Sequence, residues 1–119
     1  MHRLGLPLLI LACAALPARA EVDYGAPLSP EAAAFEAKFA DRRVTCQAEA
    51  AMRLGISNGD AMRFCECQID VFARGFTPEE MRAVELATFG SDDQADANAA
   101  AAIAATTRLI PERKRVCGH

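Results

Sequence analysis

The chain has 119 residues, which is enough for one small domain, and 24% of them are charged. It has 13 lysines and arginines against 16 aspartates and glutamates, so its formal net charge is −3 at pH 7. An acidic chain of this size is a poor candidate for nucleic-acid binding, and we expect no nucleic-acid partner. A core this small usually needs covalent reinforcement.

The first twenty residues have the organisation of an export signal. His2 and Arg3 form a short basic region, and residues 4–16 form an apolar run shorter than the roughly 20 residues that a membrane-spanning helix needs. Residues 18–20, Ala-Arg-Ala, match the small-x-small pattern of a signal peptidase site. We therefore predict a cleaved signal peptide over residues 1–20, no transmembrane segment in the mature chain, and a periplasmic or secreted protein.

An alternative for the same region is acylation. Residues 10–13, Ile-Leu-Ala-Cys, form a loose lipobox in which Cys13 would carry the lipid. Apolar sequence continues past Cys13 and a conventional cleavage site follows, so we prefer cleavage after Ala20. That cleavage removes two arginines and leaves 11 basic against 16 acidic side chains, a formal charge of −5.

After the signal, an arm precedes the helical domain predicted for residues 30–119. Residues 21–29 contain Gly and Pro and have no apolar periodicity, which predicts a flexible or extended arm. A helix is expected from Pro30, because Ser29 is a favoured N-cap residue and proline is favoured at the first helical position.

This first helix is predicted to be continuous over residues 30–54. Apolar residues recur every three to four positions, and Gly55 is suited to end the helix in the left-handed conformation. Arg42 and Arg43 interrupt the apolar stripe, which is typical of side chains that extend to solvent or form ion pairs.

A second helix, capped by Ser57, is predicted to carry the centre of the fold. Asp60 follows three residues after the cap as a short capping box, and Gly75 is expected to end the helix. Its main apolar stripe is Met62, Cys65, Ile69 and Phe72, widened by Phe64, Gln68 and Val71. Because both flanks of this helix are partly apolar, we expect other helices to pack against it on both sides.

Two further helices complete the predicted bundle. Thr77 and Glu80 form a capping box around Pro78, and the third helix is expected to end before Gly90. Residues 91–94, Ser-Asp-Asp-Gln, form another box before an alanine-rich helix that runs to Ile110. Pro111 is expected to stop or kink this helix, and a polar turn is predicted over residues 112–116. The sequence leaves a helical tail after Pro111 as an open alternative.

Four cysteines remain after signal cleavage, which in a small exported chain ordinarily means two disulfides. Cys65 and Cys67 point roughly 200° apart on a helix and cannot bond to each other. Each must therefore bond to Cys46 or Cys117. Helices joined by a tight loop run antiparallel, which places Cys46 level with about residue 66, and we prefer slightly the pairs Cys46–Cys67 and Cys65–Cys117.

The mature sequence contains no recognisable catalytic constellation. Its only histidine, His119, is at the C-terminus, where chain ends are usually exposed. Pairs of acidic residues lie where helices begin, and the helix dipole accounts for them without catalysis. We therefore expect a protein that is not an enzyme and has no cofactor.

A copper-binding protein of the periplasm is the alternative, since soft sulfur ligands suit Cu(I). Its ligands would come from Cys46, Met62, Cys65, Met81 and His119. Against it, methionine at core spacing usually fills the core, and thiols in an oxidising compartment are usually paired. A third possibility is a structural or stress-protective envelope protein, which would show a reversible transition at low pH.

The pattern of Cys46, Cys65-Glu66-Cys67, the Thr-Pro-Glu-Glu of residues 77–80 and Cys117 covers most of residues 40–117. With this pattern the chain resembles small exported all-helical proteins of proteobacteria. In layout and in its terminal cysteine it also resembles the Tai-type immunity proteins of type VI secretion, small periplasmic helical domains with a disulfide that bind and block a toxin. That resemblance implies a protein partner but identifies no binding residues.

We therefore expect an all-α bundle of about four helices, stapled by two disulfides, after a cleaved signal peptide. The expected function is that of a small non-enzymatic binding or accessory protein of the cell envelope, such as an immunity-like inhibitor or an adaptor. A protein partner would bind an exposed apolar patch, which we expect on the first or the third helix.

Overall fold

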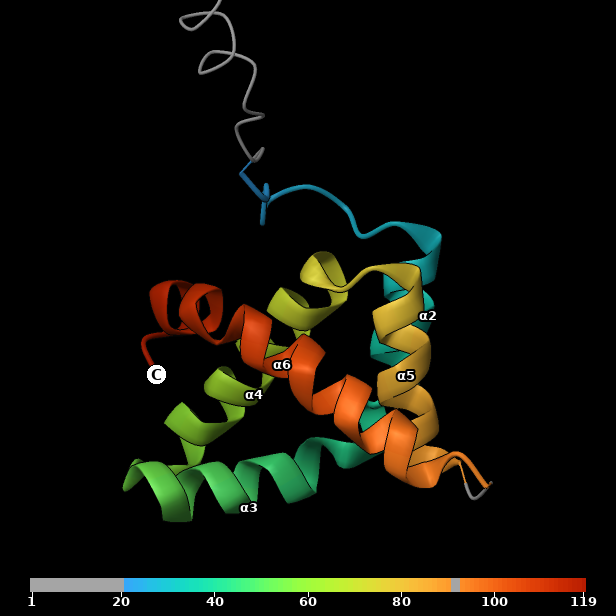
Figure 1. Ribbon diagram of the computed structural model, residues 1–119. Helices are drawn as coiled ribbons and strands as arrows, with labels where there is room; N and C mark the ends of the chain where they lie inside the picture. Colours follow the sequence, from blue (N-terminus) through green and yellow to red (C-terminus); the bar gives the residue numbers. More distant parts are fainter. Residues whose placement is uncertain (1–20, 91–92) are drawn as a thin grey trace, which may run out of the picture.

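The structure is a computed structural model that describes residues 21–90 and 93–119. Within these ranges the fold is all-α, with five α-helices and one short 3-10 helix. The elements are α2 (Pro30–Lys38), η1 (Ala40–Arg42), α3 (Arg43–Leu54), α4 (Asn58–Gly75), α5 (Pro78–Phe89) and α6 (Ala95–Cys117) (Figure 1). The predicted signal peptide, with Cys13 and Ala20, and the first two residues of the predicted cap at 91–94 lie outside the described residues.

The prediction of one continuous helix over residues 30–54 is wrong. The backbone N–H of Phe39 donates to the Glu36 carbonyl at 3.1 Å, and the N–H of Arg42 donates to the Phe39 carbonyl at 3.0 Å. These bonds span three residues and form the tight turn η1, after which α3 runs in a different direction from α2 (Figure 1). The break lets Phe35 on α2 and Ala50 on α3 enter separate core clusters, which one straight stripe would not reach.

The predicted helix starts are confirmed by three caps. The hydroxyl oxygens of Ser29, Ser57 and Thr77 each accept a backbone N–H from the first turn of the helix that follows, each at 3.1 Å. At Thr77 the box is reciprocal, because Glu80 Oε1 accepts the Thr77 N–H at 2.9 Å. At the other end of α3, Gly55 has the predicted left-handed conformation, with φ of 65°.

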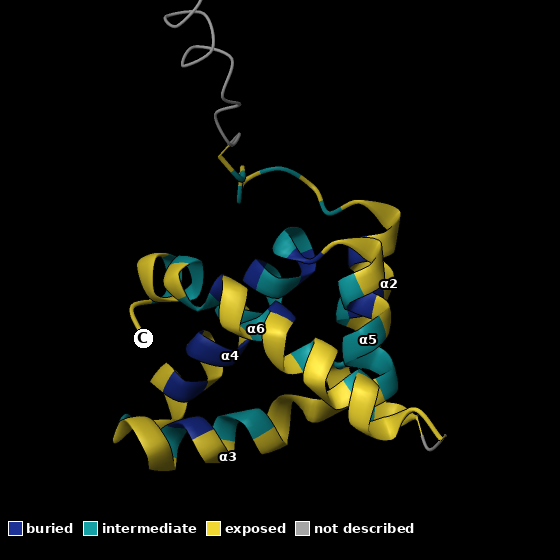
Figure 2. Cartoon of the chain, in the orientation of Figure 1, coloured by how far each residue is buried: buried dark blue, intermediate teal, exposed yellow. Residues whose placement is uncertain are grey.

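The helix α4 is the central element, as predicted. It contacts α2, α3 and α6, and its inward positions are among the most buried in the fold, with Ala61 fully buried and Val71 only 1% exposed (Figure 2). The predicted apolar stripe of α4 differs at its first position, since Met62 is 47% exposed whereas Phe64 is buried.

Gly75 is the last residue of α4 and does not have positive φ. A Cβ there would lie 2.8 Å from Leu109 Cδ1, so glycine allows α6 to approach α4 closely.

Two disulfides hold α4 to its neighbours on both sides, but our preferred pairing is wrong. Cys65 bonds to Cys46 on α3, and Cys67 bonds to Cys117 at the end of α6. The face of α4 turned to α3 carries Ala61 and Cys65 one turn apart, so Cys65 is the cysteine that meets Cys46. The predicted exclusion of a Cys65–Cys67 bond is confirmed.

The helix α6 continues past Pro111 to Cys117, so the polar turn predicted for residues 112–116 is wrong. Proline removes one backbone donor, and the last turns of α6 take a different direction from its first part (Figure 1). The extension is held by the Cys67–Cys117 bond and ends at Gly118, whose φ is 84°.

The buried side chains form two clusters along α4. The larger cluster joins α2, α4, α5 and α6 and contains Ala32, Phe35, Ala73, Phe76, Met81, Ala105 and Leu109. The smaller cluster joins α3 and α4 around Ala50, Ala61, Phe64 and Cys65. Residues of α4 take part in both clusters, so the two clusters meet along this helix.

Candidate binding site

A pocket of about 190 Å³ opens at the junction of the two core clusters. It takes walls from α2, η1, α3, α4, α5 and α6, and most of them are apolar. The lining residues are Phe35, Glu36, Phe39, Arg42, Arg43, Cys46, Cys65, Gln68, Ile69, Phe72, Phe76, Val84 and Thr106. An enclosed cavity of about 150 Å³ with apolar walls accepts benzene, so the volume of this pocket is sufficient for one bulky apolar group.

Aromatic rings form one wall of the pocket. The centroid of Phe35 lies 4.8 Å from that of Phe39 and 5.7 Å from that of Phe76, the latter edge to face. Phe72 stacks on Phe76 with centroids 5.1 Å apart. Rings that hold each other in this way form a fixed apolar surface, which binds a ligand at low entropic cost. Phe39 is the C-cap residue of α2, and its ring packs beside that of Phe35 on this wall.

The Cys46–Cys65 disulfide contributes to the opposite side of the pocket. Beside it, the Gln68 amide lies 4.0 Å from Cys46 Sγ and accepts a 3.4 Å hydrogen bond from Arg113 on α6. This side of the pocket is therefore fixed covalently to α3 and by a hydrogen bond to α6.

Charged side chains stand at the edge of the pocket, and they include two arginines and one glutamate. Arg42 donates to the Thr88 carbonyl at 3.4 Å and lies 5.3 Å from the Phe89 ring centroid, so it joins η1 to the end of α5. The side chain of Arg43 is exposed and makes no hydrogen bond or ion pair within the described ranges, whereas its backbone N–H donates to the Ala40 carbonyl. Both arginines extend to solvent, as predicted, and neither forms an ion pair with another described residue. Arg43 therefore stands as a cation at the pocket.

A larger and more polar hollow of about 590 Å³ lies between the arm and α6. Its arginines already have acidic partners within the fold: Arg74 pairs with Asp70, Arg108 with Glu80 and Arg115 with Glu112. These pairs compensate its positive charge. The smaller, apolar pocket is therefore the better candidate for a ligand site.

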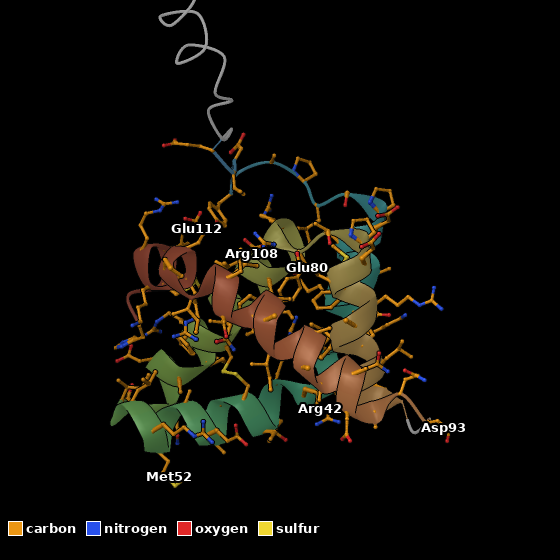
Figure 3. All side chains as sticks on the ribbon, viewed as in Figure 1. Arg42, Met52, Glu80, Asp93, Arg108 and Glu112 are labelled. Carbon is orange, nitrogen blue, oxygen red and sulfur yellow. A yellow bond between two sulfur atoms is a disulfide. The ribbon has the colours of Figure 1, made fainter. Side chains whose placement is uncertain are left out.

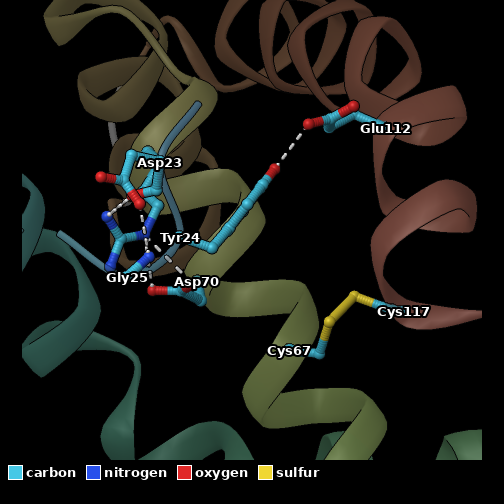
Figure 4. Close-up of polar contacts among 8 residues, drawn as sticks. Asp23, Tyr24, Gly25, Cys67, Asp70, Glu112 and Cys117 are labelled. Atoms are coloured by element: carbon cyan, nitrogen blue, oxygen red, sulfur yellow. Dashed lines mark hydrogen bonds and ion pairs between the residues drawn. A yellow bond between two sulfur atoms is a disulfide. The ribbon is translucent and has the colours of Figure 1, made fainter. Parts of the chain in front are cut away.

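Polar contacts hold the arm to the helices at this hollow. The Tyr24 hydroxyl donates to Glu112 Oε2 at 2.7 Å, and Arg74 donates to the Asp23 carbonyl at 3.0 Å (Figure 4). Burial, followed by the hydrogen bond to Glu112, raises the pKa of Tyr24 to about 12. Hydrogen bonds from Arg115 and Tyr24 lower the pKa of Glu112 to about 2. The arm is thus attached through an ionised carboxylate and a neutral phenol.

The ligands of the copper alternative are not brought together. Cys46 and Cys65 are bonded to each other, so neither presents a thiolate. Met62 is exposed, whereas Met81 belongs to the larger core cluster. His119 is exposed and has its ring 5.9 Å from that of Phe64. Among the described residues, no group of three or more His, Cys, Asp or Glu side chains is arranged to hold a metal ion.

Exposed apolar side chains occur on α3 and at the end of α5, where we expected a partner to bind, and also on α4 and α6, at Met62 and Ile103. Val44 and Met52 on α3 are each 77% exposed, and Met52 points away from the bundle (Figure 3). Phe89 at the end of α5 is 50% exposed and lies beside Arg42 and the pocket residue Phe39. The pocket itself was not predicted, because it depends on the break between α2 and α3.

Comparison with known proteins gives no indication of function, so a functional proposal has to rest on the fold and the pocket. No model of a protein family matches this chain, and neither a curated protein nor a solved structure shows significant similarity to it. In the described part of the chain, none of the helices combines the length and the apolar character needed to cross a membrane.

Proposed function

We propose that this protein is a small non-enzymatic binding or accessory protein whose pocket receives one bulky apolar side chain of a protein partner. The observation that carries the proposal is the open apolar pocket of about 190 Å³ between the two core clusters. Protein interfaces obtain much of their binding energy from a few large side chains buried in such pockets. An immunity-like inhibitor or an adaptor of the cell envelope would work in this way.

The surroundings of the pocket support a protein partner rather than a free small molecule. Phe89 extends the apolar surface beyond the pocket and is half exposed. A cavity of this volume is below the roughly 300 Å³ at which pockets for drug-sized ligands begin, but it is sufficient for a single side chain. The partner would thus place one side chain in the pocket and cover the surface around it.

An exported location is part of the proposal. Two disulfides join α4 to α3 and α6, and such bonds persist mainly in oxidising compartments. Together with the export signal predicted for residues 1–20, they support a periplasmic or secreted protein.

Photocrosslinking tests the proposal in the cell envelope. The full chain would carry benzoylphenylalanine at Glu36, at the edge of the pocket, or at the exposed Arg82 on α5 as a matched control. Arg82 is two residues from Val84, so it faces roughly the opposite side of the helix. We expect a discrete protein adduct from position 36, none from position 82, and loss of the adduct in Val84→Phe, which fills the pocket.

Two outcomes would count against a protein partner at the pocket. One is the absence of any adduct from position 36, and the other is an adduct that survives in a folded Val84→Phe variant. The midpoint of thermal unfolding of each variant shows whether it has kept its fold.

A further inference from the structure

We infer that the pocket selects an apolar side chain that is flanked by carboxylates, so that the partner docks through an acidic segment with a Phe- or Leu-sized residue at its centre. This inference rests on the proposed function and specifies the chemistry of the partner. It depends on three observations: the volume of the pocket, the charges at its edge and the fact that the Arg43 side chain has no hydrogen-bond or ion-pair partner within residues 21–90 and 93–119.

The volume limits the insertion to one side chain. About 190 Å³ is slightly more than the cavity that accepts benzene, and a phenylalanine or leucine side chain is of comparable size. The walls include the fixed rings of Phe35, Phe72 and Phe76, which favour an apolar or aromatic group over a polar one.

The charges at the pocket edge have the opposite sign to the chain as a whole. Two arginines line the pocket against one acidic residue, Glu36, although the full sequence has a net charge of −3. The nearby Lys38 and Glu85 form an ion pair at 2.8 Å and compensate each other. A segment that enters the pocket therefore meets a local excess of positive charge, which favours neighbouring carboxylates and disfavours lysines.

Arg43 is the residue best placed to recognise a carboxylate. Arg42 is engaged with the Thr88 carbonyl and the Phe89 ring. The side chain of Arg43 is exposed and makes no hydrogen bond or ion pair within residues 21–90 and 93–119. The planar guanidinium group binds a carboxylate through two parallel hydrogen bonds. A residue next to the inserted side chain would bring its carboxylate to this group.

Three capped pentapeptides test the inference with the disulfide-intact full chain. The first is Ser-Asp-Phe-Glu-Ser, the second replaces Phe with Ala, and the third replaces both acidic residues with Lys. Binding is followed by titration at low ionic strength. We expect the acidic Phe peptide to bind roughly tenfold more tightly than the lysine peptide, because an attraction is exchanged for a repulsion, and we expect no saturable binding of the Ala peptide.

Variants assign the preference to the pocket. Arg43→Gln is expected to reduce the difference between the acidic and lysine peptides to about twofold or less, whereas Arg82→Gln, at an exposed position on α5, should leave it unchanged. Val84→Phe should abolish binding of both Phe peptides. The midpoint of thermal unfolding is measured for each variant to confirm that it folds.

Three results would overturn the inference: equal binding of the acidic and lysine peptides, an unchanged preference in Arg43→Gln, or the absence of binding by every peptide. If a crosslinked adduct at position 36 persists alongside any of these results, the protein-binding function stands and only the acidic selectivity fails. If the adduct is absent as well, the proposed function fails with it.

Discussion

Arg108 on α6 donates to both carboxylate oxygens of Glu80 on α5, with its Nε 3.1 Å from Oε2. The same arginine donates to the Gly75 carbonyl at 2.8 Å, and the same glutamate accepts the Thr77 backbone N–H. One ion pair therefore joins the end of α4, the start of α5 and the middle of α6 (Figure 3). This connection holds together three of the helices that enclose the larger core cluster.

Neutralising Glu80 should weaken this connection between α4, α5 and α6 and lower the stability of the fold. Glu80→Gln keeps a side chain suited to the capping box but removes the charge that pairs with Arg108, so we expect a loss of about 0.5 to 1 kcal/mol in the free energy of unfolding. The matched control is Glu79→Gln, at the exposed neighbouring position, which should have little effect. Urea unfolding of the three proteins at pH 7 measures the difference.

The same pair predicts a pH dependence. The hydrogen bond from Arg108 holds the pKa of Glu80 below its ordinary value of 4.5. A lowered pKa in the folded state contributes stability above pH 4.5, and this contribution is lost as the pH falls below that value. The stability difference between wild type and Glu80→Gln should therefore shrink during acid titration, and a constant difference down to pH 3 would contradict the role of the charge.

Gly75 is predicted to be required for the approach of α6. In Gly75→Ala the gain of about 1 kcal/mol in helix propensity is opposed by overpacking of about 1 to 3 kcal/mol, because the new Cβ would lie 2.8 Å from Leu109 Cδ1. We expect a net loss of up to about 2 kcal/mol. In the background of Leu109→Ala the same change should be neutral or stabilising, and a double-mutant cycle measures this coupling. Additive effects would show that the two side chains do not meet.

Tyr24 offers a direct spectroscopic reading of the arm. It is the only tyrosine in a chain without tryptophan, so the ultraviolet absorbance of tyrosinate reports this residue alone. We expect it to titrate near pH 12 in the folded protein and at a lower pH in Glu112→Gln, which loses the carboxylate that accepts its hydrogen bond but keeps the burial that also raises the pKa of Tyr24. Glu66→Gln, at an exposed position on α4, is the control.

The sign of the effect on stability follows from the raised pKa. A neutral Tyr24 stabilises the folded state below pH 10, and this contribution is lost as the pH rises from 10 towards 12. A wild-type titration midpoint near 10 would show that the arm does not make this contact in solution.

The two disulfides should differ in their contribution to stability. Replacing both cysteines of the Cys46–Cys65 pair by serine opens a loop of 19 residues, and replacing those of the Cys67–Cys117 pair opens a loop of 50 residues. Chain entropy predicts losses of about 3 and about 4 kcal/mol, which is a large part of the stability of a small domain. Equilibrium unfolding of the two double variants measures both losses, and a larger loss for the shorter loop would contradict the entropic account.

The helix boundaries were predictable where a cap or a stop has a local chemical signature. Three helix starts depend on the side chain of one capping residue, and the end of α3 depends on the backbone conformation of one glycine. The residues are Ser29, Ser57, Thr77 and Gly55, and the type of each residue is enough to predict its role. The break at η1 has no such signature, because it contains no proline or glycine and arises from the packing of its two flanking helices against different clusters. The all-α fold with two disulfides is as predicted, and the fifth α-helix, beyond the four expected, results from this break.

The pairing of the cysteines and the pocket depend on tertiary contacts in the same way. Helix geometry excludes a bond between Cys65 and Cys67, but the choice of partner depends on which face of α4 meets α3. The position of Ala61 one turn before Cys65 is a signal of that face, because small residues favour close helix contact. The pocket takes its walls from all six elements and forms only after they are placed, so no local pattern indicates it.

The central claim is that an open apolar pocket lies between the two core clusters, and toluene tests it most directly. Titration of the disulfide-intact protein with this uncharged probe is followed through the methyl NMR signals. We predict saturable shifts concentrated at Ile69 and Val84, which line the pocket, and none at the exposed Val44 and Ile103. The absence of saturable shifts, or shifts centred on Val44 and Ile103, would contradict the pocket and with it the proposed function.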